Sequence, residues 1–179
     1  MDKPMSNVHF RLMSFGYKFR DLFLPRENIL REVDIKPGFQ ILDYGCGPGG
    51  YSAAAAELAG KSGKVYALDI HPLAIQRVQD SASKKRLTNM ETIRSDCDTG
   101  LPDRSMDVVL LYDTFHALSK PNEVLEELHR VLKSNGVLSF SDHHMKEAEI
   151  VTKMTDKDLF RLSRKGKRVY NFVKDTGKI

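Results

Sequence analysis

A glycine-rich segment at residues 41–50, ILDYGCGPGG, carries the first set of residues that could do chemistry. Glycine adopts positive φ readily and lets the backbone approach a ligand with no Cβ in the way. The apolar residues before the glycines predict a buried strand, and a helix beginning near Gly49 would point free backbone N–H groups at the same ligand. The segment therefore predicts a site for a nucleotide-like cofactor.

The charge of Asp43 narrows the choice of cofactor. Gly45, Gly47 and Gly50 loosely match the G-x-G-x-x-G pattern of dinucleotide-binding turns, which hold an anionic pyrophosphate. Asp43 would repel such a group, and no Lys or Arg occurs between residues 40 and 60 to offset it. A ligand with cationic character suits this turn better, while a nicotinamide-dinucleotide-dependent oxidoreductase remains the alternative from a different class.

A second set of polar residues follows two later apolar runs. Asp113 and His116 follow the first run, and segment 142–144 (DHH) follows the second. If the two runs form neighbouring parallel strands, their carboxyl ends bring these loops together, and histidine suits proton transfer near neutral pH. We therefore expect catalytic roles for His116, His143 and Asp113. The alternative for each histidine taken alone is packing or solvation.

The same Asp and His side chains have the chemistry of metal ligands, but their spacing is not diagnostic and we expect no metal. His143 and His144 are adjacent. They would point to opposite sides if they extended the strand before them.

The elements that must position these residues form an alternating pattern of strands and helices. Five apolar runs have the length and branched content of buried parallel strands: residues 40–44, 64–69, 91–94, 106–112 and 136–141. Helix patterns cover residues 51–59, 72–85, 122–133 and 146–154. Strand-like runs at residues 160–164 and 169–174 flank a tight turn at Gly166 and must be antiparallel to each other. The pattern predicts an α/β fold with an open sheet whose last strand breaks the parallel order.

The first 40 residues are organised differently. Phe15, Phe19, Leu22 and Phe23 share one helical face, before a further helix expected at residues 25–33. Such a stripe either joins the core or forms a lid over the ligand. We divide the chain into an N-terminal helical segment at residues 1–36, a candidate substrate lid, and a cofactor-binding domain at residues 37–179.

Composition bounds the class of protein. The chain has 179 residues, of which 41% are apolar, which is enough for one core of native size. Its two cysteines, Cys46 and Cys97, give no sign of a disulfide framework, which favours a cytoplasmic setting. No apolar stretch approaches the length of a membrane span, so we expect no membrane partner.

The net charge of +4 is unevenly distributed along the chain. Residues 151–179 carry nine basic and three acidic side chains, whereas residues 41–150 carry 12 and 16. The run at residues 164–168 (RKGKR) could bind phosphate groups of a nucleic acid, but a solvated hairpin tip is the preferred interpretation.

With these residues in place, the chain resembles the class I S-adenosylmethionine-dependent methyltransferases from the first strand to the last hairpin. Segment 41–49 resembles the first motif of that family, and the strand ending at Asp69 resembles the second. Segment 95–97 resembles the third, and segments 106–112 and 131–142 resemble the motifs around strands four and five. The resemblance implies a Rossmann-like fold with a seven-stranded, mostly parallel sheet in the order 3-2-1-4-5-7-6 and an antiparallel terminal strand.

The resemblance also implies the residues that hold S-adenosylmethionine and its product, S-adenosylhomocysteine. Asp43 and the turn that follows it would serve the methionine end, Asp69 the ribose hydroxyls, and Asp96 the exocyclic amine of adenine. Alternatives are a helix cap for Asp69 and a turn former for Asp96. The full implied set is Asp43, Tyr44, Gly45, Cys46, Gly47, Asp69, Ile70, Asp96, Cys97 and Tyr112.

The class of methyl acceptor is narrowed mainly by motifs that the sequence lacks. Nucleic-acid amino methyltransferases carry two prolines and an aromatic residue after an Asn or Asp that follows strand four, and segment 112–115 (YDTF) lacks both prolines. Cys46 and Cys97 do not add the thiolate set expected for arsenic methylation. We therefore expect a small-molecule acceptor, with an RNA or other nucleic-acid methyltransferase as the alternative. The sequence leaves the oligomeric state open.

Overall fold

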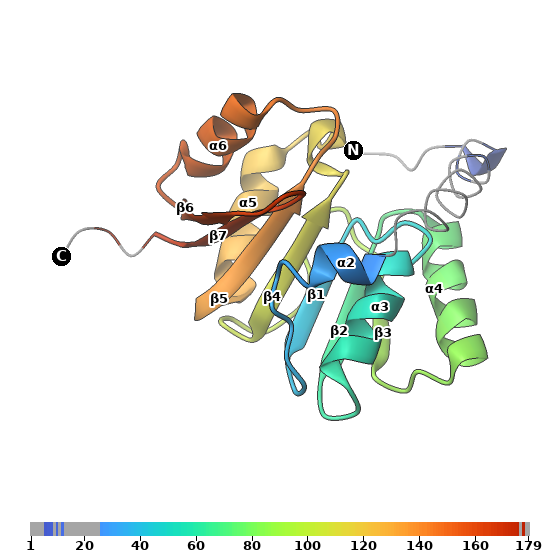
Figure 1. Cartoon of the computed structure of the whole chain (residues 1–179). Coiled ribbons are helices and arrows are strands. Elements are labelled where there is room, and N and C mark those ends of the chain that lie inside the picture. The colour runs from blue at the N-terminus through green and yellow to red at the C-terminus, as the bar shows by residue number, and fades with distance from the viewer. Residues whose placement is uncertain (1–5, 9, 11, 13–25, 176, 178–179) are drawn as a thin grey trace.

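The computed structural model describes residues 6–8, 10, 12, 26–175 and 177. A seven-stranded sheet with helices on both faces dominates these residues (Figure 1). The strands are β1 (Gln40–Tyr44), β2 (Lys64–Leu68), β3 (Met90–Ile93), β4 (Met106–Tyr112), β5 (Leu132–Ser141), β6 (Phe160–Lys165) and β7 (Tyr170–Lys174). Their order is β3-β2-β1-β4-β5-β7-β6, which confirms the predicted topology.

Strands β1 to β5 are parallel to one another, and β7 runs antiparallel to both β5 and β6. The carboxyl ends of β1, β2, β4 and β5 therefore meet at one edge of the sheet. Tyr170, the first residue of β7, pairs with Phe140 near the end of β5. The tip of the β6–β7 hairpin consequently lies at the same edge.

The helices are α2 (Arg26–Leu30), α3 (Gly50–Ala59), α4 (Pro72–Lys85), α5 (Pro121–Val131) and α6 (Glu147–Thr155), with a single 3₁₀ turn, η1 (Phe115–Ala117). Figure 1 shows α2, α3 and α4 on one face of the sheet, and α5 and α6 on the other. Among the described residues, no helix has both the length and the apolar content needed to cross a membrane.

Successive residues of each central strand point to opposite faces of the sheet, so they pack into two different hydrophobic cores. Ile41 on β1 packs with the alanine-rich α3 and with Leu30 of α2. Leu42, the next residue, packs with Leu125 and Leu128 of α5 on the opposite face. This alternation therefore determines which face of the sheet each polar residue of a central strand points to.

The boundary between α5 and β5 differs from the prediction. We predicted a helix through residue 133 and a strand from residue 136, but the helix ends at Val131 and the strand begins at Leu132. Leu132 is extended and pairs with Met106 on β4. Tertiary pairing therefore overrides the helical preference of this short stretch. Similarly, α2 is shorter than the helix predicted for residues 25–33.

The aromatic stripe predicted at Phe15, Phe19, Leu22 and Phe23 lies outside the described residues. One aromatic residue of the N-terminal segment, Phe10, is described. Its side chain is buried, and its ring stacks on that of His71 with the centroids 4.4 Å apart.

Candidate active site

A cavity of about 1190 Å³ opens at the carboxyl ends of the parallel strands. We call it the main cavity and distinguish a side near the end of β2 from a side near the end of β5. The β2 side includes Phe10, Tyr44, Gly45, Gly47, Leu68, Asp69, Ile70, His71, Ser95 and Asp96. The β5 side includes Ile29, Tyr51, Tyr112, Asp113, His116, Ser141, Asp142, His143, His144, Met145, Ile150, Arg168 and Tyr170.

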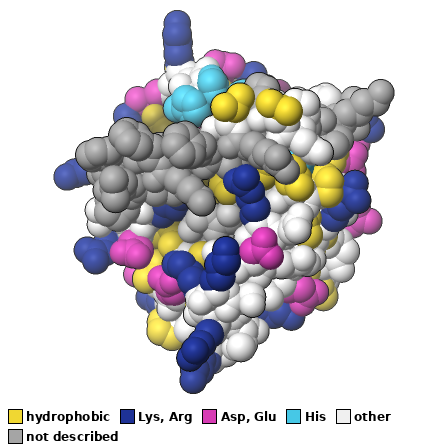
Figure 2. Space-filling view, turned by 90° about the vertical axis from the view of Figure 1, so that its right-hand side faces the viewer, with side chains coloured by type: hydrophobic (Ala, Val, Ile, Leu, Met, Phe, Trp, Pro, Cys, Tyr) yellow, Lys and Arg dark blue, Asp and Glu magenta, His cyan; other side chains and the backbone are white. Residues whose placement is uncertain are grey.

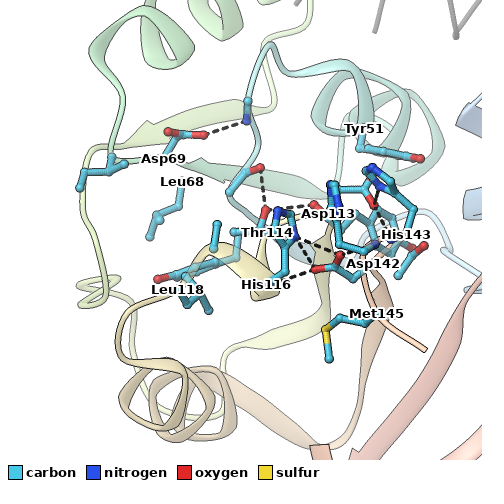
Figure 3. Close-up of a pocket in the computed structure, with 18 of the residues that line it drawn as sticks. Tyr51, Leu68, Asp69, Asp113, Thr114, His116, Leu118, Asp142, His143 and Met145 are labelled. Carbon is cyan, nitrogen blue, oxygen red and sulfur yellow. Dashed lines mark hydrogen bonds and ion pairs between the residues drawn. The ribbon is translucent and has the colours of Figure 1, made fainter. Parts of the chain in front are cut away.

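Figure 3 shows how the labelled residues are distributed across this cavity. Leu68 and Asp69 lie on one side, and Tyr51 and His143 lie on the other. His116 projects between the two groups. The predicted cofactor turn and the predicted catalytic histidines therefore face one continuous space.

The glycine turn after β1 is held close to the end of β2. The backbone N–H groups of Gly45 and Cys46 both donate to the carbonyl oxygen of Leu68, at 2.8 and 2.9 Å. Gly45 has a φ of 74°, and a Cβ at this position would overlap the side chain of Thr114 from the loop after β4. Glycine is thus required by both the backbone conformation and the space.

Asp69 joins this turn to the start of α4. Its Oδ2 accepts the backbone N–H of Gly47 at 2.9 Å, and its Oδ1 accepts that of His71 at 2.7 Å. Burial raises the pKa of the carboxyl group. The helix-cap alternative for Asp69 is wrong, because the cap of α4 is His71, whose Nδ1 accepts the N–H of Leu73. Asp69 lines the cavity, and a carboxylate oxygen can accept more than one hydrogen bond.

Asp43 lies behind the turn and does not line the cavity. It shares the α3 side of β1 with Ile41, and its buried Oδ2 accepts the hydroxyl of Ser52 at 2.5 Å. Burial raises the pKa of Asp43 to about 6. The alternation of β1 explains this orientation, because a residue two positions after Ile41 must face the same helix.

The assumption that no basic residue offsets Asp43 is wrong. Arg26 of α2 lies over the Tyr51 ring at 4.5 Å, and its charge opposes the burial effect on the pKa of Asp43. The gap in basic residues holds only along the sequence, since Arg26 lies outside residues 40–60 and reaches Asp43 only in the folded chain. Arg26 does not line the cavity, however, and the described residues on the β2 side of the lining include no Lys or Arg.

The far end of the β2 side is built from Phe10, Ile70 and the loop after β3. The Tyr44 hydroxyl donates to the backbone oxygen of Asp96 at 2.6 Å, which fixes this loop beside the turn. Burial raises the pKa of Tyr44, so its phenol is neutral. Ile70 and Asp96 line the cavity, as the adenine roles predicted for them require.

The two cysteines of the predicted set do not reach the main cavity. Cys46 is buried against Ala67 and Val78, beneath the turn. Cys97 lines a separate cavity of about 490 Å³ with several carboxylates. Burial raises the pKa of both thiols, and for Cys97 the carboxylate of Glu127 adds to this effect. Both cysteines are therefore neutral thiols.

The predicted catalytic residues form two crossed His–Asp hydrogen-bonded pairs between the loops after β4 and β5. His116 of the first loop places Nδ1 2.9 Å from Oδ2 of Asp142 in the second. His143 of the second loop places Nδ1 2.7 Å from Oδ1 of Asp113 in the first. Each loop thus supplies the histidine of one pair and the carboxylate of the other.

Asp142 is the central carboxylate of this arrangement, and our prediction of catalytic residues omitted it. Its side chain is fully buried and also accepts the backbone N–H groups of His116 and His144. The sequence could have indicated this role, because Asp142 directly follows β5 just as Asp113 directly follows β4. An Asp at the same point of two neighbouring strands predicts a pair of facing carboxylates.

The rings of His143 and His144 lie on the same side of the chain, with centroids 3.9 Å apart. The expectation that they diverge assumed that they extend the strand, but β5 ends at Ser141 and the chain turns. The ring of His144 also lies 4.1 Å from that of His116. Among residues 26–175 and the few described before them, no group of three or more acidic, His or Cys side chains has metal-binding geometry.

The crossed pairs fix which ring nitrogen is available for chemistry. An ionised carboxylate only accepts hydrogen bonds, so Nδ1 of His116 and of His143 must carry the hydrogen. Nε2 of each neutral ring then keeps its lone pair and can take a proton from a bound molecule. Tyr112 cannot serve this purpose, because its buried hydroxyl bonds to Ser139 and burial raises its pKa.

Comparison with known proteins identifies the family. The model of a methyltransferase domain matches residues 35–177. Demethylmenaquinone methyltransferase of Geobacillus stearothermophilus is 28% identical over 132 residues, which are 73% of this chain and 56% of that protein. Aklanonic acid methyltransferase of Streptomyces sp. (strain C5) is 34% identical over 112 residues, which are 56% of this chain and 51% of that protein. The chain thus spans about half the length of these curated relatives.

A solved structure matches nearly all of the chain. The crystal structure of a SAM-dependent methyltransferase from Aquifex aeolicus has a TM-score of 0.82 and 25% sequence identity, and the match covers 97% of this chain and 100% of that one. Together with the family model, which spans well over half of the residues, this likeness shows that the chain belongs to the methyltransferase domain family of S-adenosylmethionine-dependent enzymes.

Proposed function

We propose that the protein transfers a methyl group from S-adenosylmethionine to a small molecule whose acceptor atom must first lose a proton. The observation that carries this proposal is the pair of crossed His–Asp contacts beside the cofactor turn, in a cavity that runs between them. The cofactor supplies a methyl group on a positively charged sulfur. The residues of the chain bind the cofactor and the acceptor, align them, and remove the proton from the acceptor atom.

The β2 side of the main cavity fits this cofactor. Asp69 has acceptor positions for the two ribose hydroxyls, and Ile70 and Phe10 offer apolar surfaces for adenine. The carboxylates of Asp69 and Asp96 line this side, and none of its described residues is a Lys or Arg, which favours a ligand with cationic groups over a pyrophosphate. Asp43 would act through its charge from behind the turn, since it does not line the cavity.

On the β5 side, we assign the proton transfer to His116, with His143 as the second base. The His116 side chain is 31% exposed and is held by the fully buried Asp142, whereas that of His143 is 59% exposed. A base held by a buried carboxylate keeps its orientation better than one at the surface. A positioned base contributes about 10²–10⁴-fold to a rate, and alignment of the reacting atoms contributes more.

The relatives support a small acceptor. Their names specify methylation of demethylmenaquinone and of aklanonic acid. We extend to this chain only the general class, a small carbon-rich molecule, because about half of each relative's length has no counterpart here. On the face that Figure 2 shows, Lys and Arg side chains are scattered among acidic ones. This distribution gives no support for a nucleic-acid acceptor.

We further propose that residues 1–36 cover the cofactor as a lid on the domain formed by residues 37–179. The support is the position of Phe10, whose buried ring lines the main cavity and stacks on His71 next to Ile70. The guanidinium of Arg77 on α4 lies 5.2 Å from the centre of the same ring. An aromatic ring in this place would exclude water from one end of the bound cofactor.

Methyl transfer tests the proposed function. The protein is incubated with S-adenosylmethionine labelled in the methyl group and, separately, with a small-molecule cell extract, total RNA and DNA. We expect label in the small-molecule fraction, and its loss with Asp69→Ala. Transfer to RNA or DNA alone would replace the proposed acceptor class.

A further inference from the structure

Arg168 is the only Lys or Arg among the described residues that line the main cavity. It precedes β7, whose first residue pairs near the end of β5, so it lies on the side that we assign to the acceptor. Every described carboxylate that lines this side belongs to a His–Asp pair. Among the described lining residues, Arg168 therefore supplies a single Lys or Arg charge, on the side across the cavity from Asp69 and Asp96.

The hairpin tip that carries Arg168 is anchored to the chain that follows α2. The backbone N–H of Arg168 donates to the Glu32 carboxylate at 3.2 Å, and the Asn171 side chain donates to the Glu32 carbonyl at 2.8 Å. The Arg164 guanidinium also donates to this carbonyl. A Cβ at Gly166 would overlap the Glu32 carboxylate, so the glycine lets the two segments meet. The backbone of Arg168 is consequently held in place at the rim.

The guanidinium itself has no such partner. It makes no hydrogen bond or ion pair with any residue that the structure describes, although Glu32 bonds to the backbone of the same residue. By contrast, the ammonium of Lys165 at the end of β6 pairs with Glu147 at 2.6 Å. Arg168 lines the cavity, and its guanidinium carries a planar set of donors whose geometry suits a carboxylate.

The lining that Arg168 shares with the crossed pairs also includes apolar and aromatic side chains. They are Ile29 on α2, Ile150 on α6, Met145, Tyr51 and Tyr170. A molecule lying there would contact carbon along its length and meet a cation at one end.

We propose that Arg168 anchors an anionic group of the acceptor, so that the substrates are apolar molecules with a carboxylate remote from the atom that is methylated. This inference rests on the proposed function and specifies its substrate class. Arg168 fixes the orientation of the acceptor in the cavity, and His116 takes the proton at the other end.

Binding of matched probe molecules tests the anchor. The dissociation constants of benzoate and 2-naphthoate, and of the uncharged benzamide and 2-naphthamide, are measured by calorimetry with saturating S-adenosylhomocysteine. We expect each carboxylate to bind about tenfold more tightly than its amide, and Arg168→Met to abolish this preference. Lys167→Met is the matched control, since it removes one positive charge from the same turn but from a residue outside the cavity lining. It should leave the preference intact.

Three results would overturn the anchor. They are equal binding of carboxylates and amides by the unmodified protein, an equal effect of Lys167→Met and Arg168→Met, and a loss of S-adenosylhomocysteine affinity in Arg168→Met as large as the loss for carboxylates. The last result would assign the guanidinium to the cofactor. If the unmodified protein does not bind S-adenosylhomocysteine at all, the proposed function fails, and the same probes titrated without it still decide the role of Arg168.

Discussion

His116 and Asp142 lie 26 residues apart in the sequence, and their side chains meet at 2.9 Å across two loops of the sheet edge. The reciprocal contact between His143 and Asp113, at 2.7 Å, ties the same loops together in the opposite sense. Because each loop depends on the other for the partner of its histidine, the two bases are coupled in position. The buried carboxylate of Asp142 sets the orientation of His116, which makes this pair the centre of the proposed chemistry.

Removing the imidazole of His116 is expected to slow methyl transfer without weakening cofactor binding. His116→Ala should lower kcat by about 10²–10⁴-fold, because the acceptor then loses its proton to water. Asp142→Asn should cause a smaller loss of kcat, since the ring remains but is no longer oriented by a carboxylate. Steady-state kinetics and calorimetry with S-adenosylmethionine give the two quantities. His129→Ala is the control, because His129 packs against Phe160 outside the cavity. A full loss of cofactor binding in His116→Ala would contradict a role in proton transfer.

Asp69 is expected to determine cofactor affinity. Asp69→Asn keeps the shape of the side chain but weakens its acceptor capacity toward the ribose and toward the N–H groups of Gly47 and His71. We expect the dissociation constant for S-adenosylmethionine to rise by at least about tenfold, which corresponds to about 1.4 kcal/mol. Asp80→Asn removes the same charge from an exposed position on α4 and should leave the affinity unchanged. Equal affinities for Asp69→Asn and the unmodified protein would exclude this residue from the cofactor site.

Asp43 is expected to make the stability of the protein depend on pH. Burial raises its pKa from 3.8 to about 6, so the folded state binds the proton more tightly than the unfolded state. The stabilisation is present below about pH 4 and is lost as the pH rises through about 6. Asp43→Asn does not titrate. The free energy of unfolding of this variant, relative to the unmodified protein, should therefore increase from pH 5 to pH 8 by about 1.4 kcal/mol.

Chemical denaturation at the two pH values measures this difference. Ser52→Ala serves as a second variant, because it keeps the carboxylate and removes the hydroxyl that stabilises its charged form. It should shift the loss of stability to higher pH. Parallel stability curves for Asp43→Asn and the unmodified protein would show that Asp43 ionises normally in the folded state.

Substitution of Phe10 tests whether the N-terminal segment covers the cofactor. Phe10→Ala should weaken S-adenosylmethionine binding severalfold, because the ring that stacks on His71 also lines the cofactor side of the cavity. Val8→Ala is the control, since Val8 is 70% exposed on the same segment. The measurement is calorimetry of both variants. A lower melting temperature of Phe10→Ala with unchanged cofactor affinity would show that Phe10 serves the core and not a lid.

Local pattern predicted most of the framework, and the limits of the prediction have physical causes. The bounds of β1, β4 and α4 follow from periodicity and from Pro72 at the helix start. Neighbouring strand ends also predicted that the loops of His116 and His143 meet. Their pairing with Asp142 and Asp113 was not predicted, because it depends on how two loops pack after their strands end.

The environment of Asp43 shows a second limit. Its burial could have been inferred from the strand alternation, which puts it beside Ile41 and against α3. The approach of Arg26 could not, because this residue arrives from a different helix. A buried charge is compensated by the residues that lie near it in the folded chain. The residues near it in the sequence are a poor guide to which ones these are.

Titration calorimetry of the unmodified protein with S-adenosylmethionine and, separately, with NAD tests the central claim most directly. On the β2 side of the cavity, the described lining residues include Asp69 and Asp96 and no Lys or Arg. We therefore predict saturable binding of S-adenosylmethionine at one site per chain and no measurable heat with NAD. Bound S-adenosylmethionine should also raise the melting temperature. Binding and stabilisation by NAD, with no response to S-adenosylmethionine, would contradict the proposed methyl transfer.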